Sequence, residues 1–313
     1  MPLWLSEADV RAALAMPETI GAMESALAAF STRTVVQPVR TAIELREREF
    51  FALMPAYDPA HELLGAKLVS VVPRNAERGL DTHLAAISLF DVHTGELLAV
   101  MDGRWITEIR TAAVSAVSVR YLARPDAEVL AILGSGVQAR SHLRAMAEVR
   151  RFREIRAWSP TADHLRRFAR ETGAHASASA ADAVRGAGVV VLATSSVTPA
   201  IEDAWVAEGA HVIAIGACRP SHREIDPALV ARSRVIVDSK EAALQESGDV
   251  IPFGAGHVRA ELGEVIAGRA AGRTSAGEIT VFKSLGLAIE DVTAAGLAYR
   301  AAQSAGRGTV VAL

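Results

Sequence analysis

Two glycines and an alanine stand at the spacing that binds the pyrophosphate of a dinucleotide. In the segment GSGVQA, Gly134 and Gly136 occupy the first two glycine positions of this fingerprint, and Ala139 the third, where a small residue lets helix and strand pack closely. Such a turn leaves the N–H groups at the helix start open to an anion, and the helix dipole adds positive potential there. The sequence therefore predicts a dinucleotide cofactor.

A lysine inside an apolar run is the second chemical feature. Lys67 lies in GAKLVSVV, where an ammonium group is costly unless it is paired, so we expect it to face a polar cleft. Arg40 follows a strand boundary and Arg110 lies near a helix start. From the pattern alone, solvated surface positions are the better interpretation for both arginines.

The end of the second strand of a dinucleotide fold distinguishes the two nicotinamide cofactors. An acid there accepts hydrogen bonds from the ribose hydroxyls of NAD and repels the 2′-phosphate of NADP. The strand REIRAW ends instead in Ser159-Pro160-Thr161, and both hydroxyls suit a phosphate. NADP(H) is therefore favoured and NAD(H) remains possible, although Ser159 is also a suitable cap for the next helix.

The elements that position these residues fall into two kinds. In the first part of the chain, Ser6 and Asp9 form a capping-box pattern, and a second helix is expected over Glu18–Phe30. Strands then follow without helices between them, which indicates an antiparallel or mixed sheet. They are expected at Arg40–Leu45, Glu49–Pro55, Leu64–Pro73, and in a hairpin over 85–103 that turns at residues 93–95.

After a helix over Trp105–Arg124 and a break at Pro125, strands and helices alternate, which is the pattern of a doubly wound parallel sheet. The expected strands are Val129–Leu133, Glu154–Trp158, Val189–Thr194, His211–Gly216, Val235–Asp238 and Ile279–Phe282. A closing helix over Leu285–Gln303 is placed to fold back on the first domain.

Ligands of a doubly wound sheet lie at the carboxyl ends of its strands. The cofactor contacts expected at these ends and at the glycine turn are Gly134, Gly136, Val137, Gln138, Ser159, Thr161, Thr194, Ser195, Gly216, Cys218, Lys283 and Ser284.

The composition argues against several other classes of protein. The chain has 313 residues and a net charge of −3, with no basic run interleaved with aromatics, so neither nucleic acid nor a membrane surface is expected as a partner. A single cysteine, Cys218, excludes an internal disulfide and a cysteine-rich metal site, and no metal is expected. The N-terminus MPLWLSEADV has no signal-peptide pattern and no membrane span is seen, which favours the cytoplasm.

Four segments, in order, closely resemble the ornithine cyclodeaminase/mu-crystallin family. They are MDGRWITEIRTAAVSAV, GSGVQARSH, GACRPSHREIDPALVARSRVIVDSKEAALQESGDV and AELGEVIAG…TVFKSLGLAIEDV, and the latter two are closer to mu-crystallin-like members. The resemblance implies a homodimer, hydride transfer at a carbon that bears nitrogen, and an α/β fold with a Rossmann doubly wound parallel sheet. The Rossmann domain is expected over 120–291, and an α/β dimerisation and substrate domain over 1–119 and 292–313.

The resemblance also assigns roles in the substrate site. It implies that Arg40, Lys67 and Arg110 contact the substrate carboxylate, with Lys67 and Arg110 as the catalytic candidates. Thr111 would lie near the cofactor phosphate or nicotinamide, and Thr82 and His83 would line the substrate pocket.

Two departures from the family pattern shape the functional expectation. Ornithine cyclodeaminases carry carboxylates where this chain has Ala52 and Cys218, and ammonia release needs such an acid/base group. Cys218 then suits a small semi-polar pocket wall. We therefore expect an NAD(P)H-dependent reductase of a small 2-imino acid, cyclic or acyclic, that yields an L-amino acid. The alternatives are reductive amination of a 2-oxo acid, cyclodeamination of ornithine, and non-catalytic binding of a small ligand.

Overall fold

The computed structural model describes residues 1–47 and 49–312, which form two compact units. Unit 1 comprises Met1–Arg110 together with the C-terminal stretch from Leu287, and unit 2 comprises Thr111–Gly286. No helix in the described part of the chain is long and apolar enough to cross a membrane.

Unit 1 is built on a seven-stranded, mainly antiparallel sheet with strand order β15-β1-β6-β5-β4-β3-β2. Its strands are β1 (Leu3–Leu5), β2 (Thr41–Arg46), β3 (Glu49–Asp58), β4 (Leu63–Val71), β5 (His83–Phe90), β6 (Leu97–Asp102) and β15 (Thr309–Val310). The hairpin β5–β6 and the strands before it lie where the sequence predicts them. The edge strands β1 and β15 were not predicted, because two or three residues are too few to show an alternating pattern.

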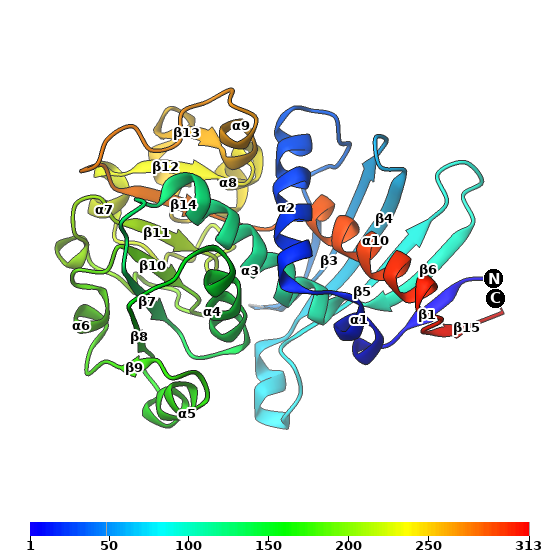
Figure 1. Cartoon of the computed structure of the whole chain (residues 1–313), viewed down its shortest axis with the longest axis horizontal. Helices are drawn as coiled ribbons and strands as arrows, with labels where there is room; N and C mark the ends of the chain where they lie inside the picture. Colours follow the sequence, from blue (N-terminus) through cyan, green and yellow to red (C-terminus); the bar gives the residue numbers. More distant parts are fainter. Residues whose placement is uncertain (48, 313) are drawn as a thin grey trace. The chain divides into compact units, whose positions relative to one another are not determined.

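Helices cover one face of this sheet. They are α1 (Glu7–Ala13), α2 (Met16–Ser31) and α10 (Ala288–Ser304), and a short 3₁₀ helix η1 (Pro73–Arg78) joins β4 to β5. The capping box predicted at Ser6 and Asp9 is present at the start of α1. Helix α10 packs on β3, β4 and β5, and α2 packs against α10 (Figure 1). The closing helix therefore returns to the first unit, as predicted.

Unit 2 is an eight-stranded parallel sheet with order β13-β12-β14-β11-β10-β7-β8-β9, which confirms the predicted doubly wound fold. Its strands are β7 (Val129–Leu133), β8 (Glu154–Trp158), β9 (His175–Ala176), β10 (Val189–Leu192), β11 (His211–Ala214), β12 (Arg234–Val237), β13 (Val258–Glu261) and β14 (Thr280–Lys283). The chain order reverses between β7 and β10, so the switch point where such sheets bind ligands lies there.

Helices cover both faces of the parallel sheet, which explains why its central strands are continuous apolar runs. The helices are α3 (Gly103–Leu122), α4 (Val137–Val149), α5 (Ala162–Thr172), α6 (Ala180–Val184), α7 (Pro227–Arg232), α8 (Lys240–Glu246) and α9 (Leu262–Ile266), with 3₁₀ turns η2 (Asp203–Trp205), η3 (Ile251–Phe253) and η4 (Ala255–His257). Buried side chains of α6, α7 and α8 form one core with alternate residues of the strands. On the other face, Ser118 of α3 contacts His211 of β11.

The division between the units falls earlier than the predicted boundaries at 119/120 and 291/292. The first boundary lies inside the uninterrupted helix α3, whose Trp105 contacts Arg11 in unit 1 and whose Ser118 is bonded within unit 2. At the second boundary, the N–H group of Gly286 donates to Asp238 of unit 2, so the chain leaves this unit only afterwards. Pro125 therefore follows the end of α3 but does not mark the boundary between the units.

Candidate active site

The glycine turn after β7 has the geometry that a dinucleotide requires. Gly134 has φ +120°, and a Cβ there would lie 2.3 Å from the carbonyl oxygen of Ala193, so only glycine fits. Gly136 precedes α4, and a Cβ on it would meet no described atom within 4 Å. No described side chain caps the start of α4, which begins at the exposed Val137 and the neighbouring Gln138. These residues fit a pyrophosphate at the helix start.

The tip of β8 joins the glycine turn through hydroxyl groups. The hydroxyl of Ser135 donates to that of Ser159 over 3.0 Å, and Ser159 is largely buried. Thr161, not Ser159, is the N-cap residue of α5. Arg140 donates to the carbonyl of Ser135 at 2.5 Å and to the carboxylate of Glu171 at 2.8 Å. The guanidinium group that contacts this turn is thus already bonded to a carboxylate.

The turns after β10 and β11 are both hydrogen-bonded to Glu224, which the sequence analysis did not identify as a site residue. Thr194 and Gly216, both predicted cofactor contacts, donate to the carboxylate of Glu224 at 2.7 and 2.6 Å. Ser195 is exposed beside them, and the half-buried thiol of Cys218 lies 3.5 Å from the carbonyl of Ile215.

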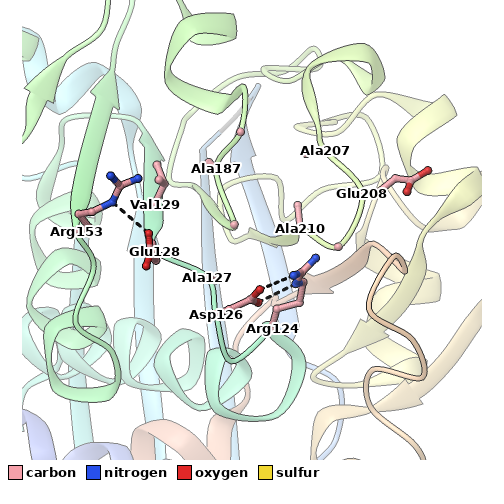
Figure 2. Close-up of a pocket in the computed structure, with 13 residues that line it drawn as sticks. Arg124, Asp126, Ala127, Glu128, Val129, Arg153, Ala187, Ala207, Glu208 and Ala210 are labelled. Atoms are coloured by element: carbon pink, nitrogen blue, oxygen red, sulfur yellow. Dashed lines mark hydrogen bonds and ion pairs between the residues drawn. The ribbon is translucent and has the colours of Figure 1, made fainter.

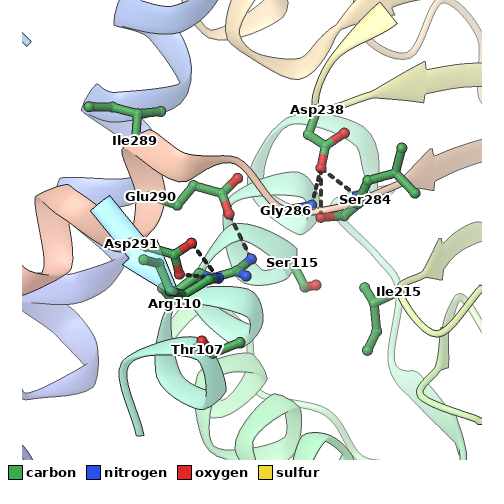
Figure 3. A network of polar contacts seen from close by, with 12 residues as sticks. Thr107, Arg110, Ser115, Ile215, Asp238, Ser284, Gly286, Ile289, Glu290 and Asp291 are labelled. Carbon is green, nitrogen blue, oxygen red and sulfur yellow. Dashed lines mark hydrogen bonds and ion pairs between the residues drawn. The ribbon is translucent and has the colours of Figure 1, made fainter. Parts of the chain in front are cut away.

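Lys283 and Ser284, also predicted as cofactor contacts, are buried at the end of β14. The Lys283 ammonium lies 3.3 Å from Asp249. Ser284 donates to Asp238 at 3.1 Å (Figure 3). Burial acts to lower the pKa of Lys283, but Asp249 and Glu224 hold it above its usual value. Both side chains therefore interact with buried carboxylates of the same unit.

In unit 1, two of the predicted substrate contacts share one carboxylate. Lys67 of β4 points to the face covered by α10, and its ammonium lies 2.5 Å from Asp291. Arg110 donates to Asp291 at 2.9 Å and to Glu290 at 2.8 Å (Figure 3). All four side chains are buried, so the interpretation of Arg110 as a solvated helix residue is wrong. Its burial requires partners, which α10 supplies.

The charges in this cluster shift one another. Burial lowers the pKa of Lys67 to about 8, although Asp291 opposes the change. For Asp291 itself burial acts upward, but Arg110 and Lys67 hold its pKa below the usual value. Both members of the pair are therefore charged at neutral pH. This cluster of positive groups on a shared carboxylate can hold an anionic ligand by charge-assisted hydrogen bonds.

The other three predicted substrate contacts lie in the same unit. Arg40 is half-buried just before β2, and its positive charge contributes to lowering the pKa of Lys67. Burial, together with Lys67 and Arg110, lowers the pKa of His83 to about 4, so its imidazole is neutral at pH 7. Thr82 is exposed before β5, whereas Thr111, the predicted cofactor contact, is buried in α3 of unit 2.

Sequence reasoning missed the acidic partners. Glu290 and Asp291 stand together in the apolar segment LGLAIEDV, and adjacent buried carboxylates need cations, which is a readable signal. Glu224 gives no such signal, because the charged run HREID around it resembles an ordinary surface loop.

One hollow of unit 2 lies away from the glycine turn. A cavity of about 290 Å³ opens at the amino ends of β7, β8, β10 and β11 (Figure 2). The glycine turn follows the carboxyl end of β7, so it lies at the other end of that strand. Its arginines are paired, Arg124 with Asp126 and Arg153 with Glu128. Ligands of doubly wound sheets bind at the carboxyl ends, so this cavity is not the candidate cofactor site. The described residues hold no metal-binding group of histidine, cysteine or carboxylate side chains.

Comparisons with known proteins agree with this arrangement. Residues 2–306 match the sequence model of the ornithine cyclodeaminase/mu-crystallin family. Ketimine reductase mu-crystallin of Rattus norvegicus is 44% identical over 283 residues, covering 88% of this chain and 90% of that protein.

Two solved structures share the whole architecture. Thermococcus litoralis Delta(1)-pyrroline-2-carboxylate reductase, in complex with NADH and L-proline, has a TM-score of 0.95 and 38% identity, covering 99% of this chain and 100% of that chain. An archaeal alanine dehydrogenase dimer with bound NAD has a TM-score of 0.94 and 33% identity, covering 99% of each chain.

Proposed function

The chain belongs to the ornithine cyclodeaminase/mu-crystallin family, and from this membership we propose that it reduces the C=N bond of a small 2-imino acid with a nicotinamide cofactor. The product is an L-amino acid. The observation that carries the proposal is the buried pair Lys67 and Arg110, held on Asp291. Two cations buried at one place suit a substrate carboxylate, which imino acids have and simple ketones lack.

Each unit contributes one part of the proposed chemistry. A bound reduced nicotinamide supplies the hydride. Gly134 and Gly136 allow its pyrophosphate to reach the backbone at the start of α4, and Lys67 and Arg110 fix the substrate carboxylate. A protonated imine is already electrophilic, so orientation and electrostatics supply most of the lowering of the barrier. No carboxylate at position 52 or 218 is required for this reaction, because it releases no ammonia.

The residues at the tip of β8 favour NADP(H) as the cofactor, and we propose that the enzyme also uses NAD(H). Positions 159–161 hold no acid that would repel a 2′-phosphate, and Ser159 and Thr161 supply hydroxyl groups. The two solved relatives hold NADH and NAD. Both cofactors therefore belong in any assay.

The second candidate function is reductive amination of a 2-oxo acid. The similarity to alanine dehydrogenase favours it. This reaction uses the same carboxylate clamp and hydride, and adds a requirement for ammonia.

We also propose a homodimer in the cytoplasm. One face of the unit 1 sheet is not covered by α10, and the strand register places four exposed apolar residues on it. They are Ile43, Leu53, Leu68 and Leu84, which are 40–59% exposed. An apolar patch of this kind is typical of a subunit interface, and the related alanine dehydrogenase is a dimer. The single cysteine suits a reducing compartment.

A substrate panel tests the proposed activity. Preformed cyclic 2-imino acids, and 2-oxo acids with methylamine or ammonia, are mixed with enzyme and NADPH or NADH, and cofactor oxidation is followed by absorbance. Reduction of preformed imines supports the proposal, and turnover only with ammonia and an oxo acid supports the amination alternative. No oxidation with any imine, or conversion of ornithine without an oxo acid, contradicts the proposed imine reduction.

A further inference from the structure

The buried carboxylate of Glu224 joins two turns at the carboxyl ends of β10 and β11. Its Oε1 atom accepts from the backbone N–H of Thr194 at 3.1 Å and from the Thr194 hydroxyl at 2.7 Å. Its Oε2 atom accepts from the N–H groups of Gly216 at 2.6 Å and Ala217 at 3.1 Å. One side chain thus satisfies three backbone donors from two separate turns.

These turns are in direct contact through their backbones. A Cβ on Gly216 would lie 2.0 Å from the carbonyl oxygen of Thr194, so the two backbones touch. The main chain of Glu224 is itself fixed, because its N–H donates to Asp249 at 2.9 Å. The carboxylate therefore lies on a rigid support, which is what precise positioning requires.

The surroundings of this carboxylate act on its pKa in opposite directions. Burial raises the pKa of Glu224, while the Lys283 ammonium, 4.0 Å from Oε2, acts in the opposite direction. Asp249 lies 3.3 Å from Lys283 and adds a second negative charge. Because both oxygens accept from N–H groups, the ionised form fits the geometry best.

We propose that Glu224 is a positioning residue that sets the two turns so that they hold the nicotinamide half of the cofactor in its reactive place. The inference rests on the proposed function, since it assigns the ends of β10 and β11 to that half. These ends lie next to the switch point between β7 and β10, where dinucleotides cross such sheets. Glu224 itself touches no ligand in this account and acts through Thr194, Gly216 and Ala217.

The test compares Glu224→Gln with Glu261→Gln. In Glu224→Gln one oxygen becomes an amide nitrogen, which cannot accept from a backbone N–H group. The variant therefore loses the backbone bonds to one of the two turns, whichever way the amide lies. Glu261 is an equally buried carboxylate at the end of the edge strand β13, where it accepts from the backbone N–H of Lys240 at 3.0 Å. This control changes a buried carboxylate that accepts from the backbone N–H groups of Lys240 and Glu264, and it does not touch β10 or β11.

Four quantities are measured: the melting temperature, the Kd of NADH by fluorescence, kcat and KM, and the isotope effect on kcat with deuterated NADH. For Glu224→Gln we expect the Kd to rise about tenfold, kcat to fall at least tenfold with an unchanged KM for the imine, and the isotope effect to increase. Glu261→Gln should lower only the melting temperature.

Two outcomes overturn the inference. One is a Glu224→Gln enzyme with a lower melting temperature but wild-type Kd, kcat and isotope effect, which would make Glu224 merely structural. The other outcome applies if Glu224→Gln does not fold, in which case Glu224→Asp is measured in its place. This variant keeps a carboxylate but shortens the side chain by one methylene, and a wild-type kcat for it would also overturn the inference. NADH binding needs no substrate, so a wild-type protein that binds NADH but reduces no imine refutes the proposed activity alone.

Discussion

Replacing Gly136 with valine should remove cofactor binding and leave the fold intact. Nothing described lies within 4 Å of the position of a Cβ, and the backbone angles of Gly136, φ −84° and ψ −163°, are accessible to valine. The stability cost is that of a poorer helix cap, about 1 kcal/mol. The isopropyl group, however, fills the space through which a pyrophosphate reaches the N–H groups of α4.

The expected loss of affinity follows from those N–H groups. Two hydrogen bonds to a charged phosphate contribute about 1.5–3 kcal/mol each, and loss of even about 3 kcal/mol in total raises Kd roughly 100-fold. Fluorescence titration with NADH and NADPH measures the Kd, and thermal unfolding without cofactor measures the stability.

Gly134→Ala is the matched comparison variant. At position 134 the protein's own backbone leaves no room for a side chain, whereas at position 136 only the bound cofactor would be obstructed. The φ of +120° at Gly134 costs alanine roughly 1–3 kcal/mol, and the Cβ would lie 2.3 Å from the carbonyl of Ala193. This variant should have a clearly lower melting temperature, whereas Gly136→Val should be close to wild type. Unchanged NADH and NADPH affinity in Gly136→Val would refute the assignment of the dinucleotide site.

Three further results are expected, two from substitutions and one from a change of pH. Lys67→Met and Arg110→Lys should each lower kcat/KM at least tenfold, because each loses a contact with the substrate carboxylate. Lys67→Met should also lower the melting temperature, because the buried carboxylate of Asp291 loses a partner. Wild-type kinetics in both variants would show that neither residue belongs to the substrate site. Ser159→Asp should weaken NADPH far more than NADH, since an acid at the tip of β8 repels the 2′-phosphate; an unaltered ratio of kcat/KM for the two cofactors would show that Ser159 does not meet the ribose. Burial lowers the pKa of His142 to about 4 and of His211 to about 3, below the usual 6.5. Their folded forms resist protonation, so stability is complete above about pH 6.5 and falls as the pH drops, by about 2 kcal/mol for each histidine at pH 5. Denaturant unfolding at pH 7 and pH 5 measures this, and equal free energies would contradict it.

The sequence predicted the parallel sheet well because its signals are local. The run Val129–Leu133 has five apolar residues followed by a glycine turn, and all five are buried on a strand covered on both faces. The edge strand β13 (Val258–Glu261) was missed, because its sequence, VRAE, is short and half polar and its pairing with β12 is a long-range property.

The candidate site was predicted only in part, for the same physical reason. Lys67 was recognised as unusual because its neighbours in sequence are apolar, but its partner Asp291 lies more than 200 residues away on α10. Arg110 gave no signal of burial, since its carboxylates are also on α10. Glu224 was not predicted, because its bonds join turns that only the folded sheet brings together.

The central claim is that hydride passes from the nicotinamide to the imine carbon of a 2-imino acid. The most direct measurement uses a preformed cyclic 2-imino acid with NADPH or NADH that carries deuterium at nicotinamide C4 on the transferred side. Mass spectrometry and NMR then locate the label in the amino acid formed. The account predicts one deuterium at carbon 2 of an L-amino acid, with cofactor oxidised in equal amount. An unlabelled product, or cofactor oxidation without an amino acid, would contradict it.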